Sequence, residues 1–477
     1  MSPIKILFWS WMVLLLGSDP QSYGRGVSTQ LTLPAIMQPS FNRMPDALPA
    51  RAVQIVSAPT PAPDPLPTPN GTIVKVSDYQ GHDIGERINN ADKALGVKEG
   101  WIQVNVVGAI STTVRLSVGH KLKFSKGRYP LNGFGKDDFP FLVENNTAIY
   151  GSGMDETTFL ESPTGYLVIG SAGLLEVERG YGWVGVRSNL RFAGFTVEGR
   201  NMTAEGGVHS TIQLGNAHDV HIWSVKLRDT TCLGITAGGT GLTGKFAENV
   251  LVEDCVFEGV ASQNLNVVNG QKITYRRNKF FRTGKRCAGG GLCEGAVAID
   301  VEPNHSSDVA RDILIEDILI DSTNSPTMHG NGIVIQNGAG ANFGNVTLHR
   351  INVIGGPLTS NDSNIASGIY LAGVHDVIVR DAYVQRVAHS GFRVESSKNI
   401  TVERVKLVST GTGGIISFEV YNTTDSRFAF NSVTVDPRSP LGRGLINETH
   451  GSNRNVFEGN IVSESIYVDG KDSRIIK

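Results

Sequence analysis

A nine-residue phrase recurs along the C-terminal half of the chain and constrains its fold more than any other feature. It reads D-V-H-I-W-S-V-K-L in its first clear copy, with positions 2, 4, 7 and 9 mostly apolar in all copies and Asp or Asn usually first. The copies begin at Asp219, Asn249, Lys272, Asp312, Asn345, Asp376, Asn399 and Asp425. Each predicts two short strands around a bend, too small to bury its own apolar side. Copies stacked about 4.8 Å apart would share one core, so the repeat predicts an all-β parallel β-helix solenoid.

A second strand lies between the copies and is usually opened by glycine, as in Gly368-Ile369-Tyr370-Leu371. Because side chains alternate along a strand, the second and fourth residues after the opener point outward. Stacking then predicts two outward columns, in which functional residues are to be sought. One column is Thr236, Asn266, Asp300, Val334, Tyr370 and Arg393, and its neighbour is Gly238, Val268, Glu302, Gln336, Ala372 and Glu395.

The segment A-I-D-V-E-P-N-H places Asp300 and Glu302 two residues apart on one such strand. Their side chains then share a face, with Cα atoms about 6.5–7 Å apart. Two neighbouring carboxyl groups repel when ionised, which raises one pKa and leaves an acid beside a base. Glycoside hydrolysis uses this division of labour, so we predict Asp300 and Glu302 as its catalytic pair. The non-catalytic alternative is a solvated or ion-paired carboxylate pair on a polar surface.

The same face would also suit other chemistry on a glycan. Elimination from a uronate polymer needs a neutralised substrate carboxylate and a base, and Asp300 with Glu302 could then hold Ca²⁺ through oxygen ligands. Hydrolysis by the pair requires no cofactor. The remaining candidates for substrate contact lie on or beside the same strands: Asn266, Gln336, Tyr370, Arg393, Glu395 and His329.

The N-terminal part of the chain differs from the repeats. An apolar run over residues 6–16 follows Lys5 and is too short to span a bilayer, so residues 1–17 resemble a signal peptide and predict a secreted or periplasmic protein. Alternating prolines then predict a disordered spacer over residues 18–70, ahead of a β-helix domain over residues 71–477. The apolar face of residues 83–95 predicts a helix that covers the open end of the core.

Charge and cysteine content narrow the partners and the compartment. A net charge of −2 gives no electrostatic reason to expect nucleic acid or an anionic membrane as a partner. In an oxidising compartment Cys287 and Cys293 could close a disulfide across C-A-G-G-G-L-C, whereas Cys255 replaces an inward apolar residue and is predicted to be a buried thiol.

The repeats, together with the helix D-I-G-E-R-I-N-N-A-D, resemble the pectate-lyase-like superfamily of right-handed parallel β-helix proteins. The resemblance covers about residues 71–477 and implies a right-handed solenoid with secreted action on polysaccharides. The sharper signatures of polygalacturonases, pectate lyases and mannuronan epimerases are absent from the sequence. The predicted function is hydrolysis of a complex glycan, with or without uronates. The alternatives are a polysaccharide lyase and a non-catalytic carbohydrate-binding or cell-surface adhesion protein.

Overall fold

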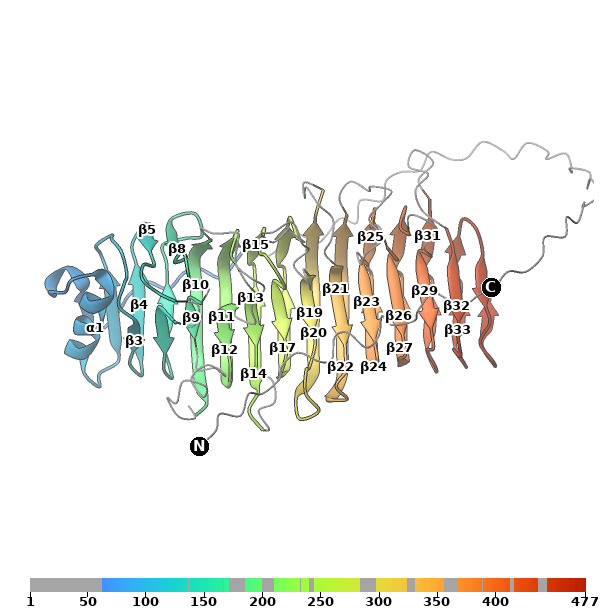
Figure 1. Cartoon of the computed structure of the whole chain (residues 1–477), viewed down its shortest axis with the longest axis horizontal. Coiled ribbons are helices and arrows are strands. Elements are labelled where there is room, and N and C mark those ends of the chain that lie inside the picture. The colour runs from blue at the N-terminus through green and yellow to red at the C-terminus, as the bar shows by residue number, and fades with distance from the viewer. Residues whose placement is uncertain are drawn as a thin grey trace, which may run out of the picture. The chain divides into compact units, whose positions relative to one another are not determined.

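The computed structural model describes residues 62–477 except 136–137, 166, 171–184, 200–209, 232, 240–243, 284–296, 324–330, 356–366, 388, 412–415 and 436–443. Coils of parallel strands are stacked along one axis from the N-terminal helix α1 to the C-terminal strands (Figure 1). The predicted right-handed parallel β-helix is confirmed. Within the described part of the chain, no helix has the length and apolarity needed to cross a membrane.

One sheet carries the second strand of each coil. Its thirteen strands are β3 (Val114–Leu116), β6 (Phe141–Val143), β9 (Ile169–Gly170), β11 (Ser210–Leu214), β13 (Leu233–Ala237), β16 (Leu265–Val267), β19 (Val297–Val301), β21 (Asn331–Gln336), β23 (Ile369–Ala372), β26 (Phe392–Glu395), β29 (Phe418–Tyr421), β32 (Ile446–Thr449) and β35 (Ile466–Val468). We call this the small sheet.

The other 23 strands form the large sheet, which contains the repeated phrase. The strands before the first copy are β1 (Ile73–Lys75), β2 (Gly100–Val104), β4 (His120–Phe124), β5 (Gly127–Pro130), β7 (Ala148–Tyr150), β8 (Thr157–Leu160) and β10 (Arg187–Glu198). The copies are β12 (Ala217–Arg228), β14 (Ala247–Glu253), β15 (Val256–Glu258), β17 (Gly270–Arg276), β18 (Lys279–Phe281), β20 (Val309–Asp321), β22 (Asn342–Ile354), β24 (His375–Arg380), β25 (Tyr383–Gln385), β27 (Lys398–Glu403), β28 (Lys406–Val408), β30 (Arg427–Ala429) and β31 (Ser432–Thr434). The last coils add β33 (Val456–Glu458), β34 (Ile461–Val462) and β36 (Arg474–Ile476).

The phrase bends where its sequence predicts a bend. The first residue of every copy has a positive φ, such as 53° at Asp219 and 52° at Asn345, and so has the sixth, such as 55° at Asp317. Asp and Asn tolerate this left-handed region better than other residues with a side chain, which explains their frequency at the first position. The apolar positions between the bends point inward, and Val220 and Val250 pair in register at 2% and 1% exposure. The core is therefore one continuous column inside the coils.

The N-terminal end of this core is covered by α1 (Ile84–Leu95), as predicted. The Asp83 carboxylate caps the helix by accepting from the Glu86 N–H at 2.7 Å. The buried face includes Ile88 and Ala91. A short 3₁₀ turn, Val76–Asp78, connects β1 to the segment before the helix. Cys255, predicted as a buried thiol, is buried and free.

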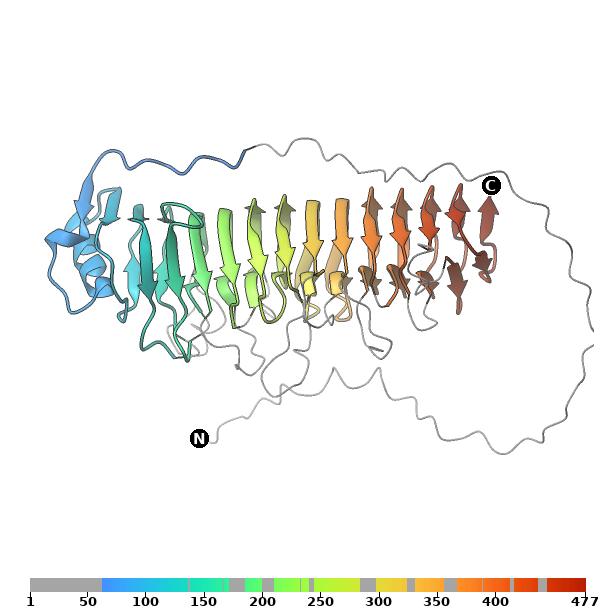
Figure 2. The same cartoon turned by 90° about the horizontal axis from the view of Figure 1, so that it is seen from above.

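Residues 62–70, the described end of the segment predicted to be a spacer, lie against the outside of the solenoid (Figure 2). Leu66 packs on an outward-facing apolar stripe of the large sheet that includes Trp101, Tyr150 and Trp223, and the Trp223 indole N–H donates to the Asp64 carbonyl at 3.0 Å. We call residues 62–70 the strap. Because outward aromatic side chains are otherwise solvent-exposed, the strap gives this stripe its apolar cover.

Candidate functional site

The two predicted outward columns lie on the outer face of the small sheet, in the predicted register. Asp300 on β19 pairs with Asn266 on one side and Val334 on the other, and Tyr370 pairs with Arg393 two strands further along. In the neighbouring column Gln336 pairs with Ala372, which pairs with Glu395. Figure 1 shows β19, β21, β23 and β26 side by side. Strand spacing places Tyr370 about 10 Å from Asp300.

Asp300 and Glu302 form a close, partly desolvated pair. Asp300 is only 2% exposed and shares a side-chain hydrogen bond with the half-buried Glu302. Burial, followed by the charge of Glu302, raises the pKa of Asp300 well above its usual value, and burial also raises the pKa of Glu302. No lysine or arginine among the described residues pairs with either carboxyl group. Burial and mutual repulsion therefore favour the protonated form of this pair more than that of isolated carboxyl groups.

Gln263 orients this pair and was not found from the sequence. Its side-chain amide donates to Asp300 Oδ2 at 2.6 Å and lies 3.5 Å from Glu302 Oε2, while its carbonyl accepts from Asn266 Nδ2 at 3.0 Å. Gln263 precedes the strand β16, so a search limited to strand columns does not reach it. The available signal was the position of this glutamine just before β16, the strand that pairs with the acidic strand β19.

Apart from the hydrogen bond within the pair, two buried side-chain oxygens here have no partner among the described residues. These are Asp300 Oδ1 and Asn266 Oδ1, which belong to residues paired across adjacent strands. Leaving a buried acceptor unsatisfied costs about 1–3 kcal/mol. The site is therefore suited to a ligand with hydroxyl groups, which can donate to Asn266 Oδ1 and can either donate to or accept from Asp300 Oδ1.

A second polar cluster occupies the same face two to four strands away. Tyr370 donates its hydroxyl to Glu395, and Glu395 Oε2 accepts from Arg393 Nε at 3.0 Å and Nη2 at 2.5 Å. Glu419 on β29 lies 3.6 Å from Arg393 Nε, and the guanidinium lies 5.5 Å from the Tyr370 ring centre. Burial is the main cause that raises the pKa values of Tyr370 and Glu419. Glu419 was missed because it lies one strand beyond Arg393, where the predicted column ended.

The structure thus brings Asn266, Gln336, Tyr370, Arg393 and Glu395 onto the face that carries the acidic pair. The remaining predictions fall on residues outside the described part of the chain: His329, Cys287, Cys293 and the apolar run over residues 6–16.

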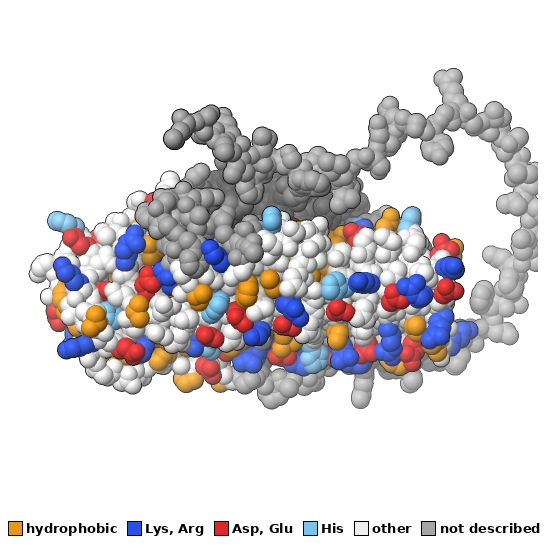
Figure 3. All heavy atoms as spheres, turned by 90° about the horizontal axis from the view of Figure 1, so that it is seen from below, with side chains coloured by type: hydrophobic (Ala, Val, Ile, Leu, Met, Phe, Trp, Pro, Cys, Tyr) orange, Lys and Arg blue, Asp and Glu red, His pale blue; other side chains and the backbone are white. Residues whose placement is uncertain are grey.

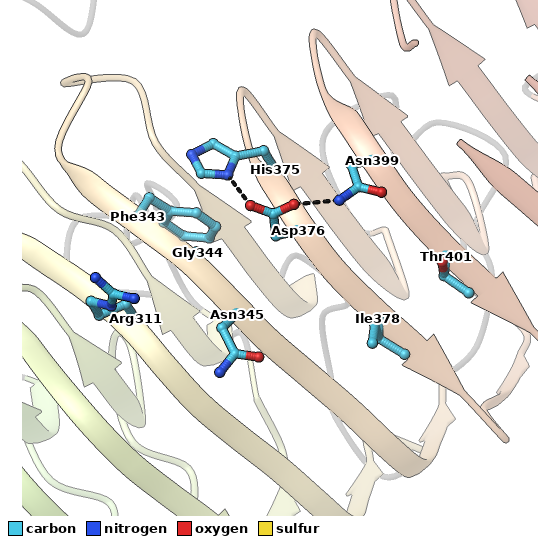
Figure 4. A pocket seen from close by; sticks show the side chains of 9 residues that line it. All are labelled: Arg311, Phe343, Gly344, Asn345, His375, Asp376, Ile378, Asn399 and Thr401. Atoms are coloured by element: carbon cyan, nitrogen blue, oxygen red, sulfur yellow. Dashed lines mark hydrogen bonds and ion pairs between the residues drawn. The ribbon is translucent and has the colours of Figure 1, made fainter. Parts of the chain in front are cut away.

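A hollow of about 480 Å³ lies elsewhere, on the outer face of the large sheet (Figure 4). Three of its polar side chains are hydrogen-bonded to one another. The His375 ring Nδ1 lies 2.7 Å from the Asp376 carboxylate, which also accepts from Asn399. These hydrogen bonds lower the pKa of Asp376. The hollow therefore offers the ordinary paired charges of a surface, unlike the outer face of the small sheet.

Asp64, His221 and Glu253 could in principle ligate a metal ion, since one ligand atom of each lies within 4.8 Å of the others. Glu253 is already neutralised, because Arg276 Nε and Arg277 Nη2 both lie 2.5 Å from its Oε2. Two guanidinium groups at this distance oppose a cation. The residues present do not fit a metal site.

No protein-family model and no curated protein matches the chain. Solved structures do. The A-module of the Azotobacter vinelandii mannuronan C-5 epimerase AlgE6 matches with a TM-score of 0.60 and 15% identity over 84% of this chain and 97% of the other. The A-module of A. vinelandii AlgE4 matches at 0.54 and 13%, over 85% and 97%. A double-mutant tailspike protein of E. coli bacteriophage HK620 in complex with a pentasaccharide matches at 0.52 and 12%, over 84% and 80%.

The chain shares the parallel β-helix fold of these structures. At these identities the similarity concerns the fold alone, so the site must be interpreted from its own residues.

Proposed function

We propose that the protein is an exported glycoside hydrolase that cleaves a complex polysaccharide on the outer face of its small sheet. The observation that carries this proposal is the hydrogen-bonded Asp300–Glu302 pair, in which Asp300 is buried, Glu302 is half-buried and neither has a cationic partner among the described residues. Pairs whose environments hold one proton on two carboxyl groups separate the roles of acid and base. The solved β-helix structures support a glycan ligand, because one of them is a tailspike protein in complex with a pentasaccharide.

In the proposed reaction Asp300 is the general acid and Glu302 is the general base. Asp300 donates its proton to the glycosidic oxygen as the bond to the anomeric carbon breaks. Glu302 takes a proton from the water molecule that attacks that carbon. The water oxygen forms the new bond, so the products are two shorter glycans with one new reducing end, and no cofactor is consumed.

The pair must open for this reaction. Glycosidases place their two carboxyl groups about 5–9.5 Å apart, whereas these two share a hydrogen bond. The Cα atoms of alternate strand residues are about 6.5–7 Å apart, and Glu302 is only half-buried. Its longer side chain can therefore turn outward when a sugar enters, while Gln263 keeps its 2.6 Å hydrogen bond to Asp300.

The test is a product analysis with the full-length protein on a panel of neutral and uronate polysaccharides. Hydrolysis gives new reducing ends without the ultraviolet absorbance of an unsaturated uronate. Glu302→Gln should abolish these reducing ends, while Asp381→Asn, a matched carboxylate on the large sheet, should keep them. Ultraviolet-absorbing products would replace the proposal with elimination. Binding without any product would replace it with a carbohydrate-binding or adhesion protein.

Chelation gives a second readout of the same proposal. Hydrolysis by the pair needs no metal, so activity should survive EDTA. If Asp300 and Glu302 instead hold Ca²⁺ for an elimination, EDTA should remove activity and added Ca²⁺ should restore it.

A further inference from the structure

The outer face of the small sheet carries more acidic than basic groups. Between β11 and β29 its two columns contain four carboxyl groups and, among the described residues, one cation. The carboxyl groups belong to Asp300, Glu302, Glu395 and Glu419, and the cation is Arg393. A uronate polymer brings one negative charge with each acidic sugar. Like charges placed opposite each other at an interface oppose association.

The one arginine is already occupied. Glu395 Oε2 binds two of its nitrogens, at 3.0 and 2.5 Å, and Glu419 Oε2 lies 3.6 Å from its Nε. A substrate carboxylate would have to compete with both for the guanidinium. It would also have to approach Glu395, which the Tyr370 hydroxyl holds in place. Arg393 therefore lacks the free fork with which arginine recognises carboxylates.

The groups left near the acidic pair are neutral hydrogen-bonding side chains. Gln263 contacts Asn266 and the pair, and neither Asn266 Oδ1 nor Asp300 Oδ1 has a partner among the described residues apart from the hydrogen bond within the pair. Gln336 lies on β21, one strand beyond β19. Hydroxyl and amide groups of a sugar can supply donors and accept from the amides in return.

We propose that the glycan taken by this face is uncharged, presenting hydroxyl and amide groups, and that Glu395 and Glu419 are specificity-determining residues that exclude uronates by keeping Arg393 neutralised. This inference rests on the proposed binding of a glycan to the face, and it holds or fails separately from hydrolysis. It also argues against uronate elimination as the reaction of this face.

The experiment measures binding of two sets of six-sugar oligosaccharides to full-length protein by calorimetry. One set contains glucose, xylose or N-acetylglucosamine, and the other contains galacturonate or mannuronate. Wild-type protein should bind a neutral oligosaccharide with an affinity that is insensitive to salt. It should bind uronates at least about 10-fold more weakly, because a repulsion of about 1.4 kcal/mol between one pair of like charges lowers an affinity 10-fold. Glu419→Gln should strengthen uronate binding about 5-fold and leave neutral binding unchanged, and Glu395→Gln should strengthen it further.

Asp381→Asn on the large sheet is the control, because it removes the same charge from the other face and should change neither affinity. Wild-type binding of uronates as tight as of neutral glycans would overturn the inference, as would an unchanged uronate affinity in Glu419→Gln. Tight neutral binding without cleavage would overturn hydrolysis and keep the inference. Absence of binding by either set would overturn both.

Discussion

The outer faces of the two sheets carry carboxylates in opposite electrostatic states. On the large sheet, Asp317 lies 2.5 Å from Arg350, and Asp381 lies 2.7 Å from Arg404. Hydrogen bonds from these arginines lower the pKa values of both acids. On the small sheet, burial raises the pKa values of Asp300, Glu302 and Glu419. One sheet thus carries a neutralised surface, whereas the other carries Asp300 and Glu302, which have no cationic partner among the described residues.

The difference follows from which position of the coil supplies the acid. On the large sheet, the sixth residue of each repeat copy adopts a positive φ, and an acid at this position meets an arginine at the same position of the next coil, as with Asp317 and Arg350. Figure 3 shows basic and acidic side chains interspersed along the solenoid on the face in view. This pairing is a property of the repeat. Acids on the small sheet lie outside the phrase, so an unpaired acid there is a departure that points to function.

The largest effect is expected at the Asp300–Glu302 pair, and its absence would contradict the contrast between the two faces. Asp300→Asn should lower the hydrolysis rate by about 10²–10⁴-fold, the usual contribution of a positioned acid, without lowering the melting temperature at neutral pH. Activity of the wild type should fall on the alkaline side as Asp300 loses its proton and on the acid side as Glu302 gains one. Rate against pH, with thermal melting of each variant, checks both points. An active Asp300→Asn protein would remove Asp300 from the mechanism.

A buried acid outside both faces tests whether burial alone produces the raised pKa. Glu161 follows β8, is 1% exposed and accepts from Thr231 and Thr211; burial raises its pKa from 4.5 to about 8. Since the folded value exceeds the unfolded one, its contribution to stability is complete below pH 4.5 and is lost as pH rises to about 8. Urea unfolding should show this loss, on the order of a few kcal/mol, and Glu161→Gln should remove it. An unchanged slope in the variant would locate the titration elsewhere.

The strap is expected to give a smaller effect. Gly194 has a φ of 71°, and a Cβ at this position would lie 2.5 Å from Leu66 Cδ1. Gly194→Ala should therefore displace the strap and destabilise the protein by about 1–2 kcal/mol, with Trp223 more accessible to a fluorescence quencher. Gly451→Ala is the control, because its φ is 80° but the nearest neighbouring atom lies at 3.5 Å. Equal quenching in the two variants would mean that the strap does not protect Trp223.

The smallest effect is expected on the paired face. Asp381→Asn removes the partner of Arg404, yet both side chains are substantially exposed, at 34% and 51%. Exposed ion pairs contribute little, so the loss of stability should not exceed about 0.5 kcal/mol and activity should not change. Denaturant unfolding and the reducing-end assay measure these quantities. A large loss of activity would show that the large sheet takes part in function.

The sequence was sufficient to predict the coils, the cap and the two columns, because each depends on a periodic pattern. The register that places Asn266, Asp300 and Tyr370 on one face follows from the inward apolar residues, which leave no freedom to slip by one position. The helix over residues 83–95 was equally readable, since its apolar residues recur at helical spacing and Asp83 caps it.

Side-chain pairing within the site was not predictable in the same way. Whether Arg393 faces a ligand or Glu395 depends on rotamers of two residues on one strand, and the sequence pattern is the same in both cases. The strap was missed for another reason. Alternating prolines predict an extended segment and do not predict that it docks. Leu66 is the one large apolar residue of residues 62–70, so the sequence carries little signal for docking. The stripe on which Leu66 packs includes Trp101 and Trp223, which are distant in sequence.

The path of the strap also connects coils that are far apart along the solenoid. Its Asp64 carbonyl accepts a hydrogen bond from the indole of Trp223, several coils away from the α1 cap, so the strap runs along the flank of the stack between β12 and β1. The N-terminal coils thus have a brace on their outer face in addition to the core that they share.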